Sequence, residues 1–185
     1  MAFVSAIILA AGKSTRFGSM KLGSLYNGRI LFSYILDSVI RSDVSQTVAV
    51  VNSTTERFIP EKNVDVVLNN SPERGMGHSI SVGISRVSEM ATGAIIIPAD
   101  MPNIGSHLIN KYITRHKEFP ERIISGIFNS VPVVPVLFPR PYFGELFALD
   151  GDKGAKSIVM RERDNIYIEL NQLEIKDIDL PSDLN

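Results

Sequence analysis

The chain is a succession of short apolar runs separated by longer amphipathic segments. The apolar runs are rich in Val and Ile and predict strands at residues 4–9, 47–51, 64–68, 94–98, 122–128, 133–138 and 166–170. Between them, apolar residues recur at helical spacing and predict helices at residues 30–42, 78–90, 105–117, 141–149 and 153–162. Strands that alternate with helices are typical of a parallel sheet covered on both faces. The pattern therefore predicts an α/β fold of three layers, α/β/α, doubly wound like a Rossmann fold and connected by right-handed crossovers.

Length and composition agree with one globular domain. The 185 residues are 44% hydrophobic and 21% charged, and they contain no internal repeat, low-complexity tract or linker, so we expect a single domain over residues 1–185. Nineteen Lys and Arg against twenty Asp and Glu give a net charge of −1. With this balance, the protein as a whole has no positive potential that would attract nucleic acid or an anionic membrane, so any site that binds an anion must be local.

The residue types exclude several kinds of chemistry. The chain has no Cys, which rules out disulfides, thiolate zinc sites, iron–sulfur clusters and a Cys nucleophile. Its three His, at positions 78, 107 and 116, are too scattered to predict a His metal cluster or a catalytic triad. The longest apolar stretch, residues 3–11, is far shorter than the roughly 20 residues that span a bilayer and lacks the charged start of a signal peptide. We therefore expect a soluble cytoplasmic protein with neither a membrane nor a nucleic acid as partner.

Open α/β sheets bind ligands at the carboxyl ends of their strands, so chemistry is expected there. Three such ends combine Gly with polar residues: 9–21, 69–79 and 98–103. The first of them is rich in Gly, hydroxyl and cationic residues. In order it contains Leu9, Ala10, Ala11, Gly12, Lys13, Ser14, Thr15, Arg16, Phe17, Gly18 and, three residues later, Lys21.

Backbone NH groups and positive charge in this first loop suit a polyphosphate. The loop is not a P-loop, because the first Gly of G-x-x-x-x-G-K-[ST] would fall at Ile7, in the middle of a strand. It is not a dinucleotide fingerprint either, because Gly12 and Gly18 are six residues apart. A Gly-rich turn with merely solvated cations is the alternative to a phosphate site.

Asp100 follows a run of four apolar residues, within the sequence Ile-Pro-Ala-Asp-Met-Pro. A carboxylate at the rim of the sheet can coordinate Mg²⁺ and leave coordination positions for phosphate oxygens. An Asp at this place could also cap a helix that starts near residue 104, or form a turn.

Two further segments, 69–80 and 151–156, place polar side chains next to Gly. Their positions of interest are Asn69, Gly75, His78, Ser79, Asp152, Lys153 and Lys156. Taken alone, the Gly residues could provide turns, and the polar side chains could be helix caps or solvated charges.

Taken together, these motifs resemble those of the MobA-like nucleotidyltransferases of molybdenum-cofactor synthesis, in particular the cytidylyltransferase branch. The first loop resembles the opening signature L-A-A-G-x-S-T-R-F-G-x-x-K, and Asp100 lies in a match to the D-x-P metal site. Residues 69–80 resemble the N-x-x-x-x-x-G-M-x-x-S-L stretch, and residues 151–156 resemble G-D-x-G-A-R with Lys in place of Arg. The resemblance covers residues 4–160 and implies the fold of the nucleotide-diphospho-sugar transferases.

The resemblance also implies a reaction and a set of site residues. The reaction is transfer of a nucleoside monophosphate, expected as CMP from CTP, to a phosphate-bearing acceptor such as molybdopterin, with Mg²⁺ as cofactor and pyrophosphate as product. Arg16 and Lys21 would be the catalytic cations on the triphosphate, and Asp100 would hold the metal. The nucleotide-binding residues would be Leu9, Ala10, Ala11, Gly12, Lys13, Ser14, Asn69, Gly75 and Ser79, and the acceptor-side residues Asp152, Lys153 and Lys156. Ala at the position of Ala11 goes with CTP in this family, and Gly goes with GTP.

One departure from the family pattern concerns the acceptor. Residues 132–138 resemble the segment G-H-P-V-L-F, but Val133 and Val134 replace its Gly and His. A polar position that faces the substrate has thus become apolar. Two alternatives therefore stay open: a nucleotidyltransferase for a sugar phosphate or another small phosphate, and a non-catalytic chaperone that binds or inserts the cofactor, with a molybdoenzyme as client.

Overall fold

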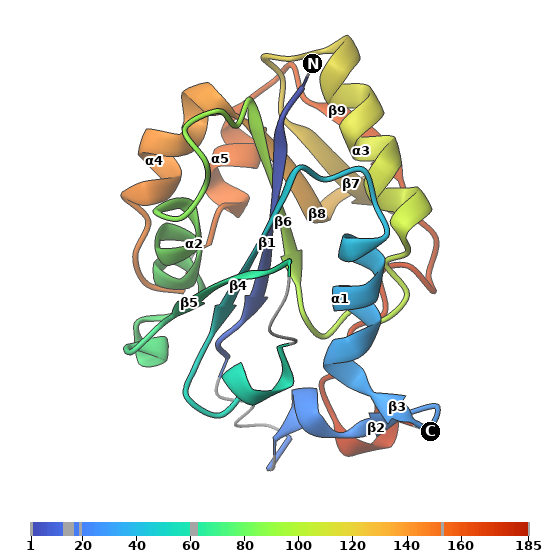
Figure 1. Ribbon diagram of the computed structural model, residues 1–185. Coiled ribbons are helices and arrows are strands. Elements are labelled where there is room, and N and C mark those ends of the chain that lie inside the picture. The colour runs from blue at the N-terminus through green and yellow to red at the C-terminus, as the bar shows by residue number, and fades with distance from the viewer. Residues whose placement is uncertain (1, 13–16, 19, 60–62, 153, 185) are drawn as a thin grey trace.

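The computed structural model describes residues 2–12, 17–18, 20–59, 63–152 and 154–184 (Figure 1). Its centre is a seven-stranded sheet with the strand order β5-β4-β1-β6-β8-β7-β9. The strands are β1 (Val4–Ala10), β4 (Gln46–Val51), β5 (Asp65–Leu68), β6 (Gly93–Pro98), β7 (Ile124–Phe128), β8 (Val131–Pro139) and β9 (Ile166–Glu169). One face is covered by α1 (Leu31–Ile40) and α3 (Ser106–Glu118). The other is covered by α2 (Met76–Ile84), α4 (Phe143–Phe147) and α5 (Lys156–Arg161), which confirms the three predicted layers.

The first half of the sheet is parallel. β1 lies between β4 and β6 and pairs in parallel with both, so that Ile7 is opposite Val48 on one side and Ile96 on the other. β4 pairs in parallel with β5. The inner strands β1, β4 and β6 are buried under helices on both faces, which explains their continuous apolar runs, whereas β5 forms the edge of the sheet and is partly exposed. All four strands end at the same edge of the sheet.

The second half departs from the parallel sheet that the sequence pattern predicted. β8 runs antiparallel to both of its neighbours, β6 and β7. The reason is the connection: β7 and β8 are joined by only Asn129 and Ser130, whose φ angles of 48° and 63° form a tight turn. A parallel crossover needs a dozen or more residues, so this linker permits only a hairpin.

Several helices differ in length from their predicted ranges. The predicted helix 78–90 was wrong for residues 85–90, because α2 ends at Ile84. Beyond that point Gln46 satisfies backbone groups in place of helical hydrogen bonds: its Nε2 donates to Arg86 O (3.0 Å), and its Oε1 accepts from Ser88 N (2.9 Å). α4 and α5 are also shorter than predicted. None of the described helices has the length and apolar character that crossing a bilayer requires.

Helix α2 packs unusually close to the sheet because of Gly83. A Cβ atom at this position would lie 2.5 Å from Ile7 Cγ2 and 3.0 Å from Val50 Cγ2, inside van der Waals contact. The missing side chain thus allows the helix backbone to approach β1 and β4. The close contact lies near the end of α2, whereas the start of the helix follows the loop of residues 69–75 at the carboxyl edge of the sheet.

Candidate active site at the strand ends

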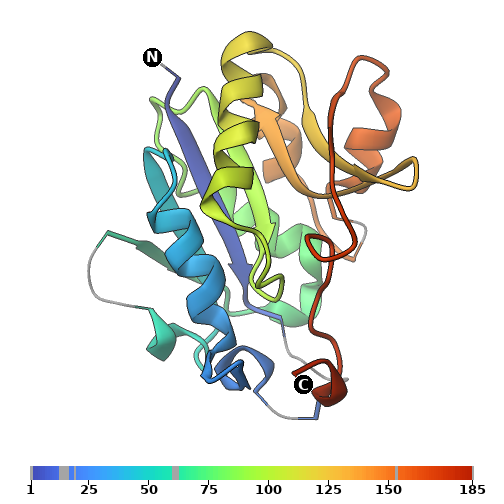
Figure 2. The same ribbon diagram turned by 90° about the vertical axis from the view of Figure 1, so that its right-hand side faces the viewer.

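The carboxyl edge of the parallel strands brings together the three segments predicted to carry chemistry. They follow β1, β5 and β6, which end at the same edge. A fourth segment comes from the far end of the chain: residues 171–184 run along this edge and finish near residues 20–26 (Figure 2). The backbone NH of Ile178 donates to the carbonyl of Asp100 (3.0 Å), which holds this segment to the end of β6.

Lys21 is the buried cation of the site. Its Nζ donates to Asp100 Oδ2 at 2.7 Å and to Asp179 Oδ1 at 3.0 Å. The Lys21 side chain is 11% exposed, against 24% for Asp100 and 46% for Asp179. Burial alone would lower the pKa of Lys21, but the charges and hydrogen bonds of Asp100 and Asp179 outweigh this effect and raise the pKa above its ordinary value. The ammonium is therefore charged at any pH at which the protein would work.

Asp177 adds a third carboxylate to this cluster. Partial burial, followed by repulsion from Asp179 and Asp100, raises its pKa above the ordinary value. Neither Asp177 nor Asp179 was among the residues predicted from the sequence. The available signal was the pattern Asp-Ile-Asp around the fully buried Ile178, because alternation in an extended segment places both carboxylates on the side away from the core.

The carboxylates around Lys21 have the chemistry of a magnesium site. Mg²⁺ is typically held by one or two protein carboxylates together with phosphates of the substrate. In the described part of the chain, no group of three or more His, Asp or Glu side chains is already arranged to hold a metal. Instead, the Lys21 ammonium lies where oxygens of Asp100 and Asp179 converge. The donor set fits a divalent cation that takes over these oxygens from Lys21.

At the start of the first loop, backbone carbonyl groups of Ala10 and Ala11 are held by hydrogen bonds from neighbouring side chains. The carbonyl of Ala10 accepts a hydrogen bond from Thr55 Oγ1 (2.9 Å), and that of Ala11 accepts one from Asn52 Nδ2 (3.0 Å). Ala11 as a residue is 1% exposed and belongs to the core cluster beneath α2. Asn52 and Thr55, which the sequence did not single out, therefore fix where the loop leaves β1, and Gly12 emerges exposed.

The loop before α2 is held by an internal pair of predicted residues. Asn69 is 2% exposed; its Nδ2 donates to Ser79 Oγ (3.0 Å), and its Oδ1 accepts from the NH of Ser71 (2.9 Å). These bonds use both ends of the Asn69 amide within the protein. The structure thus gives Asn69 and Ser79 a role in shaping the loop.

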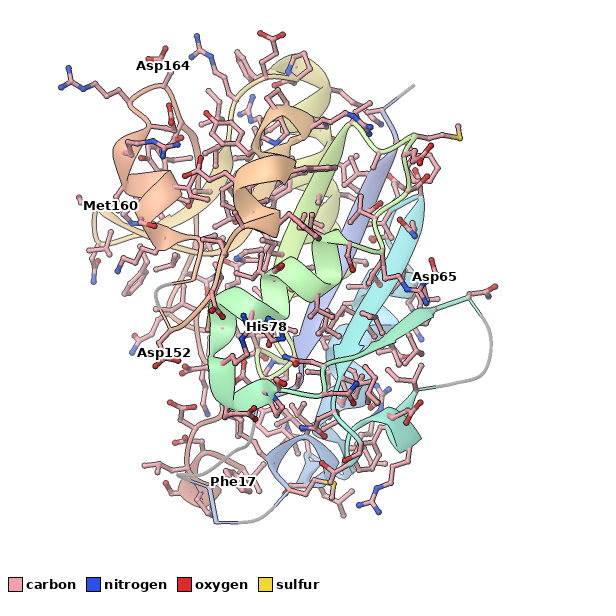
Figure 3. The ribbon with its side chains drawn as sticks, turned by 90° about the vertical axis from the view of Figure 1, so that its left-hand side faces the viewer. Phe17, Asp65, His78, Asp152, Met160 and Asp164 are labelled. Carbon is pink, nitrogen blue, oxygen red and sulfur yellow. The ribbon has the colours of Figure 1, made fainter. Side chains whose placement is uncertain are left out.

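The same loop packs against the segment that carries the predicted acceptor-side residues. Gly75 has a φ of 90°, which favours Gly, and a Cβ atom there would collide with Asp152. The NH of Gly77 donates to the carbonyl of Gly151 (2.8 Å). Figure 3 shows His78 and Asp152 on this side of the molecule, with Phe17 below them. The structure therefore brings the 69–79 and 151–156 segments together, as a shared site would require.

A cavity of about 460 Å³ opens beside these segments, on the face of the sheet covered by α2 and α5. It includes the predicted residues Leu9, Asp152 and Lys156, and it reaches Asp177. The remaining lining residues are Met76, Ile80, Ile96, Pro98, Met101, Ser125, Pro132, Val133, Val134, Val136, Phe138, Gly154, Ala155, Val159 and Ile175. Four of the predicted residues, Lys13, Ser14, Arg16 and Lys153, lie outside the described residues.

Comparison with known proteins gives consistent relatives. A family model described as "MobA-like NTP transferase domain" matches residues 6–166. The purine catabolism protein PucB of Bacillus subtilis is 27% identical over 169 residues, which cover 85% of this chain and 80% of PucB. The structure of Rv0371c from Mycobacterium tuberculosis, also solved in complex with manganese, superposes with a TM-score of 0.85 at 24% identity and covers 98% of this chain and 95% of its own. A Methanothermobacter nucleotidyl transferase gives a TM-score of 0.79 at 18% identity, with 98% and 94% covered. These neighbours confirm the predicted fold class of the nucleotide-diphospho-sugar transferases.

Proposed function

The chain belongs to the MobA-like NTP transferase family, and from this premise we propose that it transfers a nucleoside monophosphate from a nucleoside triphosphate to a phosphate-bearing acceptor. The observation that carries the proposal is the position of Lys21 between Asp100 and Asp179, at the strand ends where the first loop begins. A cation and carboxylates at one point are what a triphosphate and its counter-ion need. The family match is also consistent with the resemblance seen in the sequence motifs.

The reaction needs no general base from the protein. An oxygen of the acceptor phosphate, anionic near neutral pH, forms a bond to the α-phosphorus of the triphosphate, and the bond from that phosphorus to the bridging oxygen breaks. Pyrophosphate leaves with the electron pair of that bond. Catalysis then rests on alignment and on stabilising charge, to which Lys21 and Arg16 contribute by binding the triphosphate. This agrees with the absence of any paired His among the described residues of the site.

We further propose that the divalent cation is Mg²⁺ and that Asp100 holds it together with Asp177 or Asp179. When bound, such an ion neutralises phosphate charge and polarises the phosphorus centre. Lys21 is then free to turn its ammonium from the carboxylates to the phosphates of the nucleotide. The manganese complex of Rv0371c supports a divalent ion in a protein of this fold.

The expected donor is CTP, because Ala11 carries the residue type that goes with CTP in this family. The first acceptor to test is molybdopterin, with a molybdoenzyme as the client that receives the product. Val133 and Val134 favour the second candidate, a nucleotidyltransferase for another small phosphate, because both line the cavity beside the site where the family segment has Gly and His.

The decisive experiment measures pyrophosphate release by the full chain. Each of four nucleoside triphosphates is combined with Mg²⁺ or Mn²⁺ and with molybdopterin, sugar phosphates or simple phosphate monoesters. We expect acceptor-dependent release that is lost in Lys21→Met and kept in Lys111→Met, an exposed Lys on α3. Release that never depends on an acceptor, or that survives Lys21→Met unchanged, would contradict the proposal.

A further inference from the structure

The cavity beside the carboxylate cluster has an apolar interior. Its most enclosed lining residues are Ile80, Ile96, Met101, Val136, Phe138 and Val159, each at most 7% exposed. They come from α2, β6, the loop after β6, β8 and α5, so hydrocarbon surrounds the space from several sides. A volume of about 460 Å³ is within the range of small-molecule sites.

The charged side chains of the lining lie at its edge. Asp152, Lys156 and Asp177 are all exposed residues. The lining also contains Ser125, which is fully buried and whose hydroxyl already donates to the carbonyl of Gly126 (2.9 Å). A ligand body that enters the cavity therefore meets few side-chain groups able to replace the hydrogen bonds it made with water.

Two successive residues of β8, Val133 and Val134, both line the cavity, next to an irregularity in the pairing of β7 with β8. Gly126 is paired with Val133, but the preceding residue of β7, Ser125, is paired with Val136. Val134 and Pro135 thus have no partner on β7, as in a β-bulge. Val133 therefore adds one more apolar residue to the lining, beside the alternating residues of β8.

We propose that the acceptor is a phosphate monoester with a small hydrocarbon body, and not a polyhydroxylated sugar or a pterin. This inference rests on the proposed function, whose acceptor site it assigns to the cavity. Hydroxyl groups buried in such a space would lose water without gaining partners, whereas a hydrocarbon body gains from leaving water. Lys156, the described cation of the lining, is placed at the edge to hold the acceptor phosphate, and Asp177 connects that edge to the Asp100 cluster.

The reaction with this acceptor is balanced as proposed above. A phosphate oxygen of the monoester forms the bond to the α-phosphorus, pyrophosphate leaves, and the carbon–oxygen bond of the monoester stays intact. The hydrocarbon body takes no part in the chemistry, so it affects binding and alignment only.

The test compares two acceptors that differ only in hydroxyl groups. Cyclohexyl phosphate and myo-inositol 1-phosphate share a six-membered carbon ring, and the second bears a hydroxyl on each of its other ring carbons. With the full chain, the preferred nucleotide and Mg²⁺, we expect kcat/KM for cyclohexyl phosphate to be at least about tenfold higher. Calorimetric titration of both compounds in the presence of nucleotide measures the same preference without turnover.

A matched pair of variants tests the wall of the cavity. Val134→Thr keeps the shape of the side chain and replaces one methyl group with a hydroxyl, while Val131→Thr makes the same change at an exposed position of β8 that does not line the cavity. We expect Val134→Thr to reduce the preference for cyclohexyl phosphate at least about threefold and to leave KM for the nucleotide unchanged. Val131→Thr should leave the preference within about twofold of the parent. Val133→Thr serves in place of Val134→Thr if that variant fails to fold.

The outcomes separate this inference from the function on which it rests. The inference would be overturned if the protein used both ring compounds equally, preferred the inositol compound, or preferred molybdopterin. Turnover in any of these cases would still support the proposed nucleotidyltransferase activity. Selective binding of cyclohexyl phosphate without any turnover would uphold the cavity assignment and count against nucleotidyl transfer. Neither binding nor turnover of cyclohexyl phosphate would overturn the inference.

Discussion

Lys21 and Asp100, 79 residues apart in the sequence, are joined by a hydrogen bond of 2.7 Å between the Lys21 ammonium and Asp100 Oδ2. The bond links the segment after the first strand to the end of β6. It places the expected phosphate-binding cation directly on the expected metal ligand. Cation and metal then compete for the same carboxylate, so loading of the site with metal and nucleotide should release Lys21 to the phosphates.

The first prediction concerns Asp100. Asp100→Asn should keep the fold and lower kcat/KM at Mg²⁺ saturation at least about a hundredfold, which corresponds to about 2.7 kcal/mol of barrier. The amide keeps the size of the side chain but loses the charge that a hard cation requires. Pyrophosphate release measured against Mg²⁺ concentration checks it. Asp164→Asn is the control, because Asp164 is exposed in the bend before β9, and its turnover should equal that of the parent. Normal turnover by Asp100→Asn would show that Asp100 is not a metal ligand.

The second prediction separates binding of phosphate from binding of the nucleoside. Lys21→Ala and Arg16→Ala should each weaken binding of the triphosphate at least about tenfold, because each removes a cation from a strongly anionic group. The free nucleoside should bind equally well to parent and variants. Calorimetric titration with nucleoside, monophosphate and triphosphate measures the difference, and an equal loss for all three would show that the variants had damaged the fold instead.

The third prediction concerns the close packing of α2 on the sheet. Gly83→Ala should lower the free energy of unfolding by about 1 to 3 kcal/mol, because its Cβ would press on Ile7 and Val50. Gly144→Ala is the matched control: Gly144 is an exposed position of helix α4 with nothing within 4 Å of the new Cβ, so the change should be neutral or stabilise by up to about 1 kcal/mol. Urea denaturation of both variants decides the matter. Equal stabilities would mean that α2 shifts away from the sheet at little cost.

The fourth prediction is a pH dependence of stability that comes from His116. The side chain is buried, its Nε2 lies 3.1 Å from Thr92 Oγ1, and its Nδ1 has no hydrogen-bond partner within the described part of the chain. Burial lowers the pKa of His116 below its ordinary value of 6.5. As the pH falls below about 6.5, His116 binds a proton in the unfolded chain but stays neutral in the folded protein, so the free energy of unfolding decreases. Above that pH, the contribution is fully present.

Urea midpoints measured from pH 7.5 to pH 5.5 check this expectation. The decrease should be smaller in His116→Gln, which cannot take up the proton, than in the parent. His107→Gln changes an exposed His at the start of α3 and should follow the parent curve. Parallel curves for the parent and His116→Gln would show that other groups cause the loss of stability.

Much of the fold was determined by local sequence pattern. The strands were found because inner parallel strands must be apolar on both faces, and the helices because an amphipathic segment must turn one face to the sheet. The direction of β8 was missed, since it depends on the two-residue turn at Asn129 and Ser130 and not on the apolar run itself. The end of α2 was missed for a similar reason: Gln46, far away in sequence, binds the backbone at residues 86 and 88.

Some residues of the candidate site were likewise predictable from local sequence, and others were not. Ordered motifs identified Lys21 and Asp100 because each motif is continuous in the sequence. Asp177 and Asp179 belong to no such motif, and they join the cluster only because the chain returns along the edge of the sheet and Ile178 hydrogen-bonds to Asp100. The sequence alone thus determined the family and the chemical character of the loops, since both are carried by neighbouring residues. Tertiary structure decided which distant carboxylates surround Lys21 and how apolar the neighbouring cavity is, because both depend on which segments the fold brings together through space.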